Sequence, residues 1–441
     1  MKHLSLFLCR KYLCARKVIL LSITAVALSC ALLITVASLF TGFIDTFEKS
    51  SSRHMGDIVI AAPEGLNISR YDELIGDLQA NPNIEAATGV LSSQGLLLLD
   101  KGNVRAVQVW GIELPRRTTV TPFAEGLVRQ NETSAAVGFL APAEPGWLAG
   151  FVGIAVLAKA DEKTDQYDME KVKDQIGKKV LLTTGSGQNK KTVGIKFVIS
   201  DVVFSGIYEF DKNFIYLPIE ELAEKLYPGQ GKLADTIHIR LGPGIDPQAA
   251  LAVVRGIFRN FAREKLNWSS YAVSLTGINT SAGMQARLIA EYKKQMAMLM
   301  LIFGVVSGGV VLLICCIFYL IVMTRQKDIA VVKSCGLGSG PVALLFIAFG
   351  MMTGLIGSAL GVAIGCAVTK NINRIEQWIS SVFGLKLWKS STYMFSTVPN
   401  RIDWESVLWI VAAAVLAAGI GALIPAVVAA GLKPVEILRY E

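Results

Sequence analysis

The sequence predicts an α-helical membrane protein with four transmembrane helices and a large α+β extracytoplasmic domain inserted between helices 1 and 2. The first observation is composition: the 441-residue chain is 52% hydrophobic and 18% charged, whereas soluble domains usually carry about a quarter charged residues. The second is distribution. Four stretches lack Asp, Glu, Lys and Arg, and each exceeds the roughly 20 apolar residues that cross ~30 Å of hydrocarbon as a helix. They are residues 18–44, 295–324, 334–369 and 406–432.

These stretches set the predicted boundaries along the chain. Residues 1–17 mix Leu and Phe with Arg and Lys, which indicates either an interfacial amphipathic helix or a simple basic flank. The apolar run of helix 18–44 is longer than the 7 to 15 residues of a cleavable signal sequence, so we expect it to remain as an anchor. The other segments are the inserted domain 45–294, helix 295–324, a short cytoplasmic helix 325–337, helix 338–369, an extracytoplasmic loop 370–405, helix 406–432 and a cytoplasmic tail 433–441.

The basic residues predict the orientation. Five Lys or Arg lie in the first seventeen residues, and the short segment after the second helix adds Arg325, Lys327 and Lys333. By the positive-inside rule both segments face the cytoplasm. The loop 370–405 also holds five basic residues, which argues the other way, but the N-terminal cluster is denser and adjoins the first helix. Cytoplasmic flanks facing anionic lipid account for the net charge of +8, so we expect no binding of nucleic acid.

The inserted domain is predicted to be stable without disulfides. No cysteine lies between Asp45 and Lys294, and about 250 residues suffice for a core of their own. Its patterns predict an α+β fold in one or two lobes, with an exposed polar loop at 183–194 and a helix that runs from Thr280 directly into the second span. The expected strands are 57–61, 96–99, 104–110, 179–184, 196–206, 214–218 and 236–240, and the expected helices are 71–80, 220–226 and 247–265.

The sequence offers no catalytic constellation, so we predict no catalytic residue, no metal site and no cofactor bound by this chain. The three histidines are far apart without ligand-type spacing. The segment 184–192, TGSGQNKKT, lacks the glycine that precedes the lysine of a phosphate-binding loop, and it lies on the predicted outer side. The four charge-free stretches also disfavour a carrier driven by a proton relay. Energy for any transport must therefore come from a partner.

The third helix carries glycines at spacings of three and four, which place them along one face. Small residues let helices in a membrane approach closely, so helix packing is the favoured interpretation, with a substrate path as the alternative. The glycines are Gly350, Gly354, Gly357, Gly361 and Gly365. In the fourth helix, Pro425 is tolerable where neighbours satisfy the freed carbonyl.

Two segments carry a family resemblance. The segment from Arg325 to Gly336, RQKDIAVVKSCG, resembles the R-x-[KR]-E-I-[GA]-[IV]-L-[KR]-x-x-G segment of FtsX/MacB-type ABC transporter permeases. In that family this segment is the coupling helix that docks on the ATP-binding subunit. The resemblance implies that Ile329 and Val332 are available to a groove on that partner. The implied coupling residues are Arg325, Gln326, Lys327, Asp328, Ile329, Val332, Lys333 and Gly336.

The end of the chain resembles the P-A-x-x-A-A-x-x-x-P-x-E-x-L-R terminus of the same family. The matching residues are Pro425, Ala426, Ala429, Ala430, Pro434, Glu436, Leu438 and Arg439. Both motifs lie at the expected ends of a layout with one helix, an external domain and three helices. The chain is therefore identified as a member of the FtsX/MacB-like permeases, which implies a MacB-like periplasmic core in the inserted domain.

Further segments are similar to the lipoprotein-releasing, LolC/LolE-like branch. They are residues 10–42, Gln94–Leu97, Trp110–Glu113, Phe204–Asp211 and Val398–Trp404. This resemblance implies a permease in the cell inner membrane with no ATPase of its own. It implies as partners an ATP-binding cassette ATPase that binds ATP, a second permease copy or paralogue, lipoprotein cargo from the outer leaflet and a soluble periplasmic carrier. The carrier-binding hook of the branch would fall near 183–196, which is polar and basic here.

The mode of action implied by the resemblance is mechanotransmission, in which ATP hydrolysis in the partner moves the external domains. Two alternatives remain open on the sequence. One is a MacB-like exporter of a peptide or small molecule, and the other is an FtsX-like regulator of a cell-wall hydrolase.

Overall fold

The computed structural model describes residues 17–99, 102–132, 137–140, 146–161, 164–185, 192–384, 386–390, 395 and 397–439. The predicted amphipathic segment before residue 17 lies outside this range. The chain divides into two compact units. The membrane unit comprises residues 1–44, 289–375 and 398–441, and the outer domain comprises residues 45–288 and 376–397.

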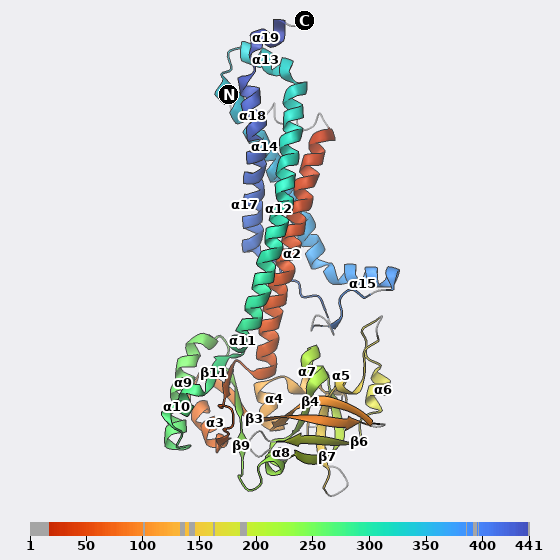
Figure 1. Ribbon diagram of the computed structural model, residues 1–441, viewed down its shortest axis with the longest axis vertical. Helices are drawn as coiled ribbons and strands as arrows, with labels where there is room; N and C mark the ends of the chain where they lie inside the picture. The colour runs from red at the N-terminus through yellow and green to blue at the C-terminus, as the bar shows by residue number, and fades with distance from the viewer. Residues whose placement is uncertain are drawn as a thin grey trace. The chain divides into compact units, whose positions relative to one another are not determined.

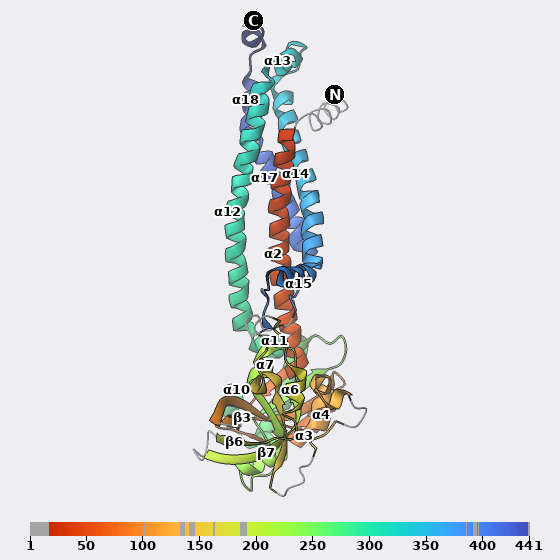
Figure 2. The ribbon, with the colours of Figure 1, turned by 90° about the vertical axis from the view of Figure 1, so that its right-hand side faces the viewer.

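In the described part of the chain, four helical spans are long and apolar enough to cross a membrane, as the sequence predicts. They are α2 (Lys17–Met55), α12 (Ala286–Thr324), α14 (Ser339–Lys370) and the pair α17 (Trp404–Gly421) and α18 (Leu423–Gly431). Within the membrane unit they run side by side in both views (Figures 1 and 2). With 39 residues each, α2 and α12 are about 58 Å long at 1.5 Å per residue, which is longer than the hydrocarbon of a bilayer.

The fourth span is not one continuous helix. It is interrupted at Ala422, between α17 and α18. The cause lies three residues further on, because Pro425 has no N–H for the carbonyl of Gly421 and its ring crowds that carbonyl. The amide of Ala422 still donates to the carbonyls of Ala418 and Gly419 at 3.2 Å. The proline therefore produces a break at this position rather than a loss of the span.

The glycine face of α14 lies directly on two neighbouring helices. A Cβ at Gly350 would stand 2.5 Å from the Cβ of Ala422, and one at Gly354 would stand 2.7 Å from that of Ala418. One helical turn further along, the face changes partner and meets α2, the first span. Cβ atoms at Gly357, Gly361 and Gly365 would stand 2.7, 2.6 and 3.2 Å from Val26, Cys30 and Ala31. All five glycines are buried in these contacts.

The outer domain is built on one nine-stranded sheet in the order β11-β1-β10-β3-β4-β8-β5-β7-β6, and β3 also pairs with β6. This extra pairing closes six strands into a ring, while the first half of β3 continues into β10, β1 and β11. The strands are β1 (Ile58–Ala61), β3 (Ile84–Leu99), β4 (Asn103–Ile112), β5 (Leu148–Gly153), β6 (Lys179–Gly185), β7 (Thr192–Val203), β8 (Phe214–Pro218), β10 (Thr236–Leu241) and β11 (Gly277–Thr280), with β2 (Ile68–Ser69) and β9 (Leu233–Ala234) forming a separate pair.

Helices complete the core of the outer domain. Three amphipathic helices bury their apolar faces in the same cluster as the sheet, through residues such as Leu74, Leu222 and Phe258. The helices of the domain are α3 (Tyr71–Gln79), α4 (Leu114–Val120), α5 (Ile154–Leu157), α6 (Met169–Lys173), α7 (Tyr208–Asn213), α8 (Ile219–Leu226), α9 (Pro247–Glu264), α10 (Ser270–Leu275) and α11 (Ser281–Met284). The α+β class is as predicted, and both parts of the sheet share β3, so they are not independent lobes.

Three details differ from the sequence-based expectations. Strand β3 begins at Ile84 and has 16 residues, far more than the predicted 96–99. The helix expected from Thr280 begins instead as the one-turn α11, and α12 starts at Ala286 after an interruption at Gln285. The segment expected as a loop at 370–405 contains a twelve-residue helix, α15 (Ile372–Phe383).

The glycine face of α14 gives a stability prediction with a matched control. Gly361→Ala should lower the stability of the membrane unit by about 1–3 kcal/mol, because the new methyl must displace α2. Gly308→Ala in α12 adds the same methyl where nothing lies within 4 Å, and alanine favours a helix over glycine by up to about 1 kcal/mol. Melting of the full-length chain in detergent measures both. Equal melting temperatures for the two variants would contradict the close packing.

Candidate functional site

The two predicted family motifs meet at one end of the membrane unit. There α13 (Gln326–Ser334) follows α12, and its Lys333 Nζ donates hydrogen bonds of 2.7 Å to the carbonyls of both Ala430 and Leu432. These carbonyls end α18, where the helix leaves acceptors unpaired and its dipole favours a positive charge. Lys333 therefore fastens the first motif to the second. We call α13, the end of α18 and α19 (Pro434–Arg439) the α13 cap.

Helix α13 buries one side and exposes the other. Ile329 is 9% exposed and packs in an apolar cluster with Val322, Val342 and Ala429. The expectation that Ile329 is available to a partner is therefore wrong, because this side chain is part of the chain's own core. Val332 is exposed as expected, and Val331 is exposed as well, at 36% and 51%. The outward surface of α13 is thus formed by this valine pair with Lys327 and Asp328.

Two further residues of the first motif shape the ends of α13. Arg325 Nη1 pairs with Asp328 Oδ2 at 2.9 Å across the first turn. At the other end, Gly336 has φ of +95°, a left-handed backbone that only glycine adopts without strain. Its amide donates to the carbonyl of Lys333 at 3.0 Å, which ends the helix. Gln326 is the first residue of the helix.

The C-terminal motif is mainly a packing motif in the described residues. Pro425, Ala426 and Ala429 are buried in α18, and Ala430 contributes the carbonyl that accepts from Lys333. Pro434 begins α19 at a position where a helix tolerates the missing N–H. The side chains of Glu436, Leu438 and Arg439 lie outside the described part of the chain.

In the outer domain, the last turn of α2 is fixed by a buried arginine. Arg117 of α4 is 2% exposed. Its Nη2 donates to the carbonyl of His54, near the C-terminus of α2, and its Nη1 donates to Nδ1 of His238 at 2.8 Å. The guanidinium also lies 5.3 Å from the ring centre of Trp110. Burial lowers the pKa of Arg117 to about 10, so the group remains charged at neutral pH and His238 remains the neutral acceptor.

The two chain segments that lead from the outer domain to the spans are joined at their base. Strand β1, which follows α2, pairs antiparallel with β11, which precedes α11 and α12. The hydroxyl of Ser281 donates to the carbonyl of Gly56, and its amide donates to that of Asp57 at 3.0 Å. Gly56 has φ of +75°, and a Cβ there would stand 2.5 Å from the Ile239 carbonyl oxygen. The base is therefore a hydrogen-bonded joint that leaves no room for a larger residue at Gly56.

The Phe204–Asp211 motif supports the attachment of a distant segment. Asp211 is buried, and its Oδ1 accepts from the amide and hydroxyl of Ser205 at 2.6 and 2.7 Å. Ile207, two residues after Ser205, forms a β-bridge with Phe395. In the same segment, Ser390 donates from its amide and hydroxyl to Asp165 Oδ2 at 2.7 and 2.8 Å. Ser390 and Phe395 are thereby fastened to the part of the outer domain that lies between α2 and α12.

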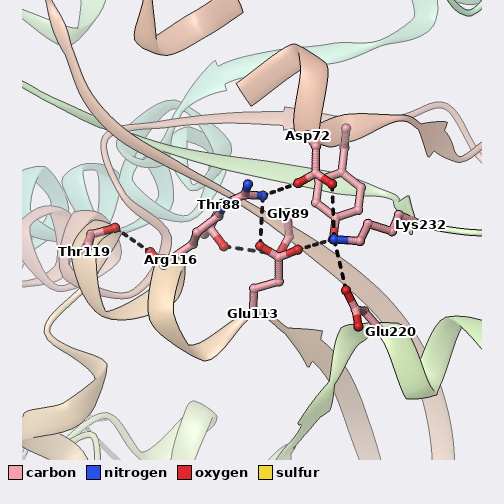
Figure 3. A network of polar contacts seen from close by, with 9 residues as sticks. Asp72, Thr88, Gly89, Glu113, Arg116, Thr119, Glu220 and Lys232 are labelled. Carbon is pink, nitrogen blue, oxygen red and sulfur yellow. Dashed lines mark hydrogen bonds and ion pairs between the residues drawn. The ribbon is translucent and has the colours of Figure 1, made fainter. Parts of the chain in front are cut away.

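The Trp110–Glu113 segment places an ion-pair network beside α4. A Cβ at Gly111 would stand 2.9 Å from Leu222 Cδ2, so α8 lies directly on this strand. Figure 3 shows Arg116 between Glu113 and Asp72, and Lys232 between Asp72 and Glu220. The Arg116–Glu113 and Lys232–Glu220 distances are 2.9 and 3.0 Å. Most of these side chains are a third or more exposed, so the network adds geometric definition more than stability.

The hook region expected near 183–196 is described in part, because residues 183–185 end β6 and residues 192–196 begin β7. Residues 186–191 lie outside the described range, between β6 and β7. The described flanks place Lys179 and Lys196 Nζ 5.1 and 5.9 Å from the ring centre of Trp147. Among the described residues, no group of three or more His, Cys, Asp or Glu could hold a metal ion.

Comparison with known proteins gives consistent matches. The family model of the MacB-like periplasmic core domain matches residues 19–257, and that of the FtsX-like permease C-terminal domain matches residues 299–434. The lipoprotein-releasing system transmembrane protein LolC of Neisseria meningitidis serogroup B is 24% identical and covers 98% of both chains. LolC of Xylella fastidiosa is also 24% identical over 95% of this chain and 93% of its own. Among solved structures, the periplasmic region of MacB from Actinobacillus actinomycetemcomitans matches 55% of this chain and 97% of its own at 13% identity, with a TM-score of 0.32.

Two buried groups give the outer domain opposing dependences on pH. Burial, with the charge of Arg117, holds the pKa of His238 well below 6.5. The unfolded chain therefore gains a proton there as the pH falls below about 6.5, and stability falls with it. Burial raises the pKa of Asp211 from 3.8 to about 6. The folded chain therefore binds the extra proton between about pH 4 and 6, and stability falls as the pH rises through that window.

Single substitutions should separate these two effects. From about pH 5 to 7, the Asp211→Asn variant should gain thermal stability more steeply than the parent chain, because the opposing Asp211 contribution is absent while His238 and His54 still titrate below their usual pKa. The His238→Gln variant should gain less stability than the parent chain over the same interval, because only His54, whose pKa burial lowers to about 4, then opposes the Asp211 contribution. Melting of the full-length chain at several pH values measures both slopes. Parallel slopes in the two variants would show that these groups do not titrate as the structure requires.

Proposed function

Because the chain belongs to the FtsX-like permeases with a MacB-like periplasmic core domain, we propose that it is the permease subunit of an ABC transporter that releases lipoproteins. The observation that carries this proposal is the similarity to LolC chains over almost the whole length of both proteins. The two family matches also fall on the expected parts: the core domain model matches most of the first span and the outer domain as far as residue 257, and the FtsX-like model matches the last three spans from residue 299.

The proposed site of energy input is the outward surface of α13. An ATP-binding subunit would dock on Val331 and Val332, with Lys327 and Asp328 beside them, in the cytoplasm. Exposed valines on a polar helix suit a partner groove, because they lose water contact when covered. ATP would be bound and hydrolysed by that subunit, and this chain supplies the surface that it moves.

The proposed path of the motion begins at the α13 cap. A push on α13 would move the end of α18 with it, since Lys333 joins both, and the buried Ile329 cluster would carry the motion to α12 and α14. Helices α2 and α12 would transmit it, because a helix held by its own hydrogen bonds moves as a rod. The joint at Gly56, Asp57 and Ser281 would receive it in the outer domain. This is mechanotransmission, and it requires no catalytic residue in the chain.

Cargo and assembly complete the proposal. The chain would lie in the cell inner membrane with the outer domain extracytoplasmic, paired with a second permease copy or paralogue. Helix α12 exposes a row of apolar side chains, including Leu301 at 68% and Val305 at 71%, which suits lipid, acyl cargo or a second permease. Release to a soluble periplasmic carrier would follow.

The docking surface can be tested by comparing substitutions at exposed and buried positions of α13. Val331→Asp with Val332→Asp should abolish co-purification of the ATP-binding subunit in detergent while leaving the melting temperature of the permease nearly unchanged. Ile329→Asp should instead lower the melting temperature, because it places a charge in an apolar cluster. If the double variant retains its partner, α13 does not dock through this surface.

The cargo assignment needs a test in cells. Depletion of the chain should cause acylated proteins to accumulate in the inner membrane, as fractionation and immunoblotting would show. An altered division pattern and cell-wall turnover with normal lipoprotein sorting would instead support the regulatory alternative. Normal sorting together with the retention of a peptide or small molecule would support an exporter.

A further inference from the structure

Helix α15 separates apolar and polar residues completely around its axis. At 100° per residue its six apolar side chains fall within one arc, and its six polar or charged side chains fall on the rest. The apolar face consists of Ile372, Ile375, Trp378, Ile379, Val382 and Phe383. The polar face carries the charges Arg374 and Glu376. Such a pattern is typical of a helix that lies between an apolar and an aqueous phase.

The apolar face is partly covered at Ile372, Ile375 and Ile379 and open toward its far end within the described chain. No residue of α15 is buried. Trp378, Val382 and Phe383 are 64%, 58% and 66% exposed, which is unusual for three neighbouring large apolar side chains. A second phase or molecule must therefore cover this face.

The start of α15 is held at the end of the membrane unit. One residue, Asn371, separates it from α14. The Asn373 amide group exchanges two hydrogen bonds with the backbone of Val398, of 3.1 and 2.9 Å, just before α17. The side chain of Asn400 donates to the Thr369 carbonyl at 2.9 Å. Both spans that flank α15 are thus tied to its first turn.

The neighbouring residues suit a bilayer interface. Trp404 and Trp409, at the start of α17, are 66% and 70% exposed. Tryptophan is enriched where hydrocarbon meets headgroups, and the apolar face of α15 carries a tryptophan as well, Trp378. Lys370 and Arg374 can meet phosphate groups there.

We propose that α15 is an interfacial helix whose apolar face inserts among the phospholipids of the leaflet on the side of the outer domain. The side follows from the topology, because the inserted domain and the loop between spans 3 and 4 emerge on the same face of a four-span chain. After α15, Ser390 and Phe395 are fastened to Asp165 and Ile207 of the outer domain. The helix therefore gives the outer domain a third attachment to the membrane, besides α2 and α12. This inference is independent of the cargo.

Depth-dependent quenching of a fluorophore tests the proposal. The full-length chain, with its seven cysteines replaced by alanine, is labelled with an environment-sensitive dye at Val382→Cys or, as the polar-face control, at Gln377→Cys. Both positions are exposed, so neither label should disturb folding. The protein is reconstituted in vesicles of phosphatidylcholine and phosphatidylglycerol. Quenchers are iodide in the water and nitroxide-bearing lipids with the nitroxide near the headgroup or near the chain end.

The label at position 382 should emit at shorter wavelength than the label at 377. It should be quenched more strongly by the shallow lipid nitroxide than by the deep one, and weakly by iodide, whereas the label at 377 should respond mainly to iodide. Trp378→Ser with Phe383→Ser should remove the blue shift at 382, and Ser381→Ala should not. Equal iodide quenching at both positions would overturn the proposal. Protection of the label at 382 from both iodide and the lipid nitroxides would also overturn it, because a protein surface such as a second copy would then cover the apolar face.

Discussion

The arrangement of the membrane unit depends on the glycine face of α14. Inside hydrocarbon the hydrophobic effect does not drive helices together, so close van der Waals contact must do it. Glycines supply that contact in two directions, since Gly350 and Gly354 admit α17 and α18 while Gly357, Gly361 and Gly365 admit α2. The same helix then fixes both ends of the unit. At one end Val342 packs with Ile329 of α13, and at the other Thr369 and Asn371 lead into α15.

Basic side chains bind the C-terminal carbonyls of two helices. One is a partly exposed lysine and the other a buried arginine, and each side chain suits the burial and the number of acceptors at its site. Lys333 is partly exposed and points one ammonium group at two carbonyls of α18. Arg117 is fully buried and divides its planar guanidinium among a carbonyl of α2, the ring nitrogen of His238 and the face of Trp110. A lysine at position 117 could not satisfy three directions with one compact group. Each contact places a residue distant in sequence at a helix end that would otherwise leave acceptors unpaired.

The sequence is enough to predict the membrane spans and the family, but not which side of each helix is buried. The four consecutive apolar residues Ile329 to Val332 lie on all sides of α13, so the hydrophobic pattern alone does not show which of them is buried. Ile329 is buried because it packs against Val322, Val342 and Ala429 from three other helices. The length of strand β3 is underestimated from the sequence because polar residues interrupt its apolar pattern at 92–95. These four residues line an open groove of about 960 Å³ beside β4 and β6. Helix α15 carried a clear 3.6-residue period, and a search for amphipathic as well as charge-free segments would have found it. The Arg117–His238 contact, 121 residues apart, has no local signal.

The packing of α2 against α12 indicates where the membrane unit can change shape at least cost. In the membrane unit, the hydroxyls of Ser29 and Ser307 are 2.7 Å apart, and the rings of Phe43 and Tyr292 meet edge to face at 4.9 Å. Beside the serine pair lies a cavity of about 260 Å³, lined by α2, α12 and α17 and bordered by Gly304. Side chains at a cavity have few dispersion contacts to lose, so displacement there costs less than at the glycine contacts of α14. In the outer domain the pairing of β1 with β11 opposes separation of the two segments at their base. Separating α2 from α12 therefore costs less beside this cavity than at the joint.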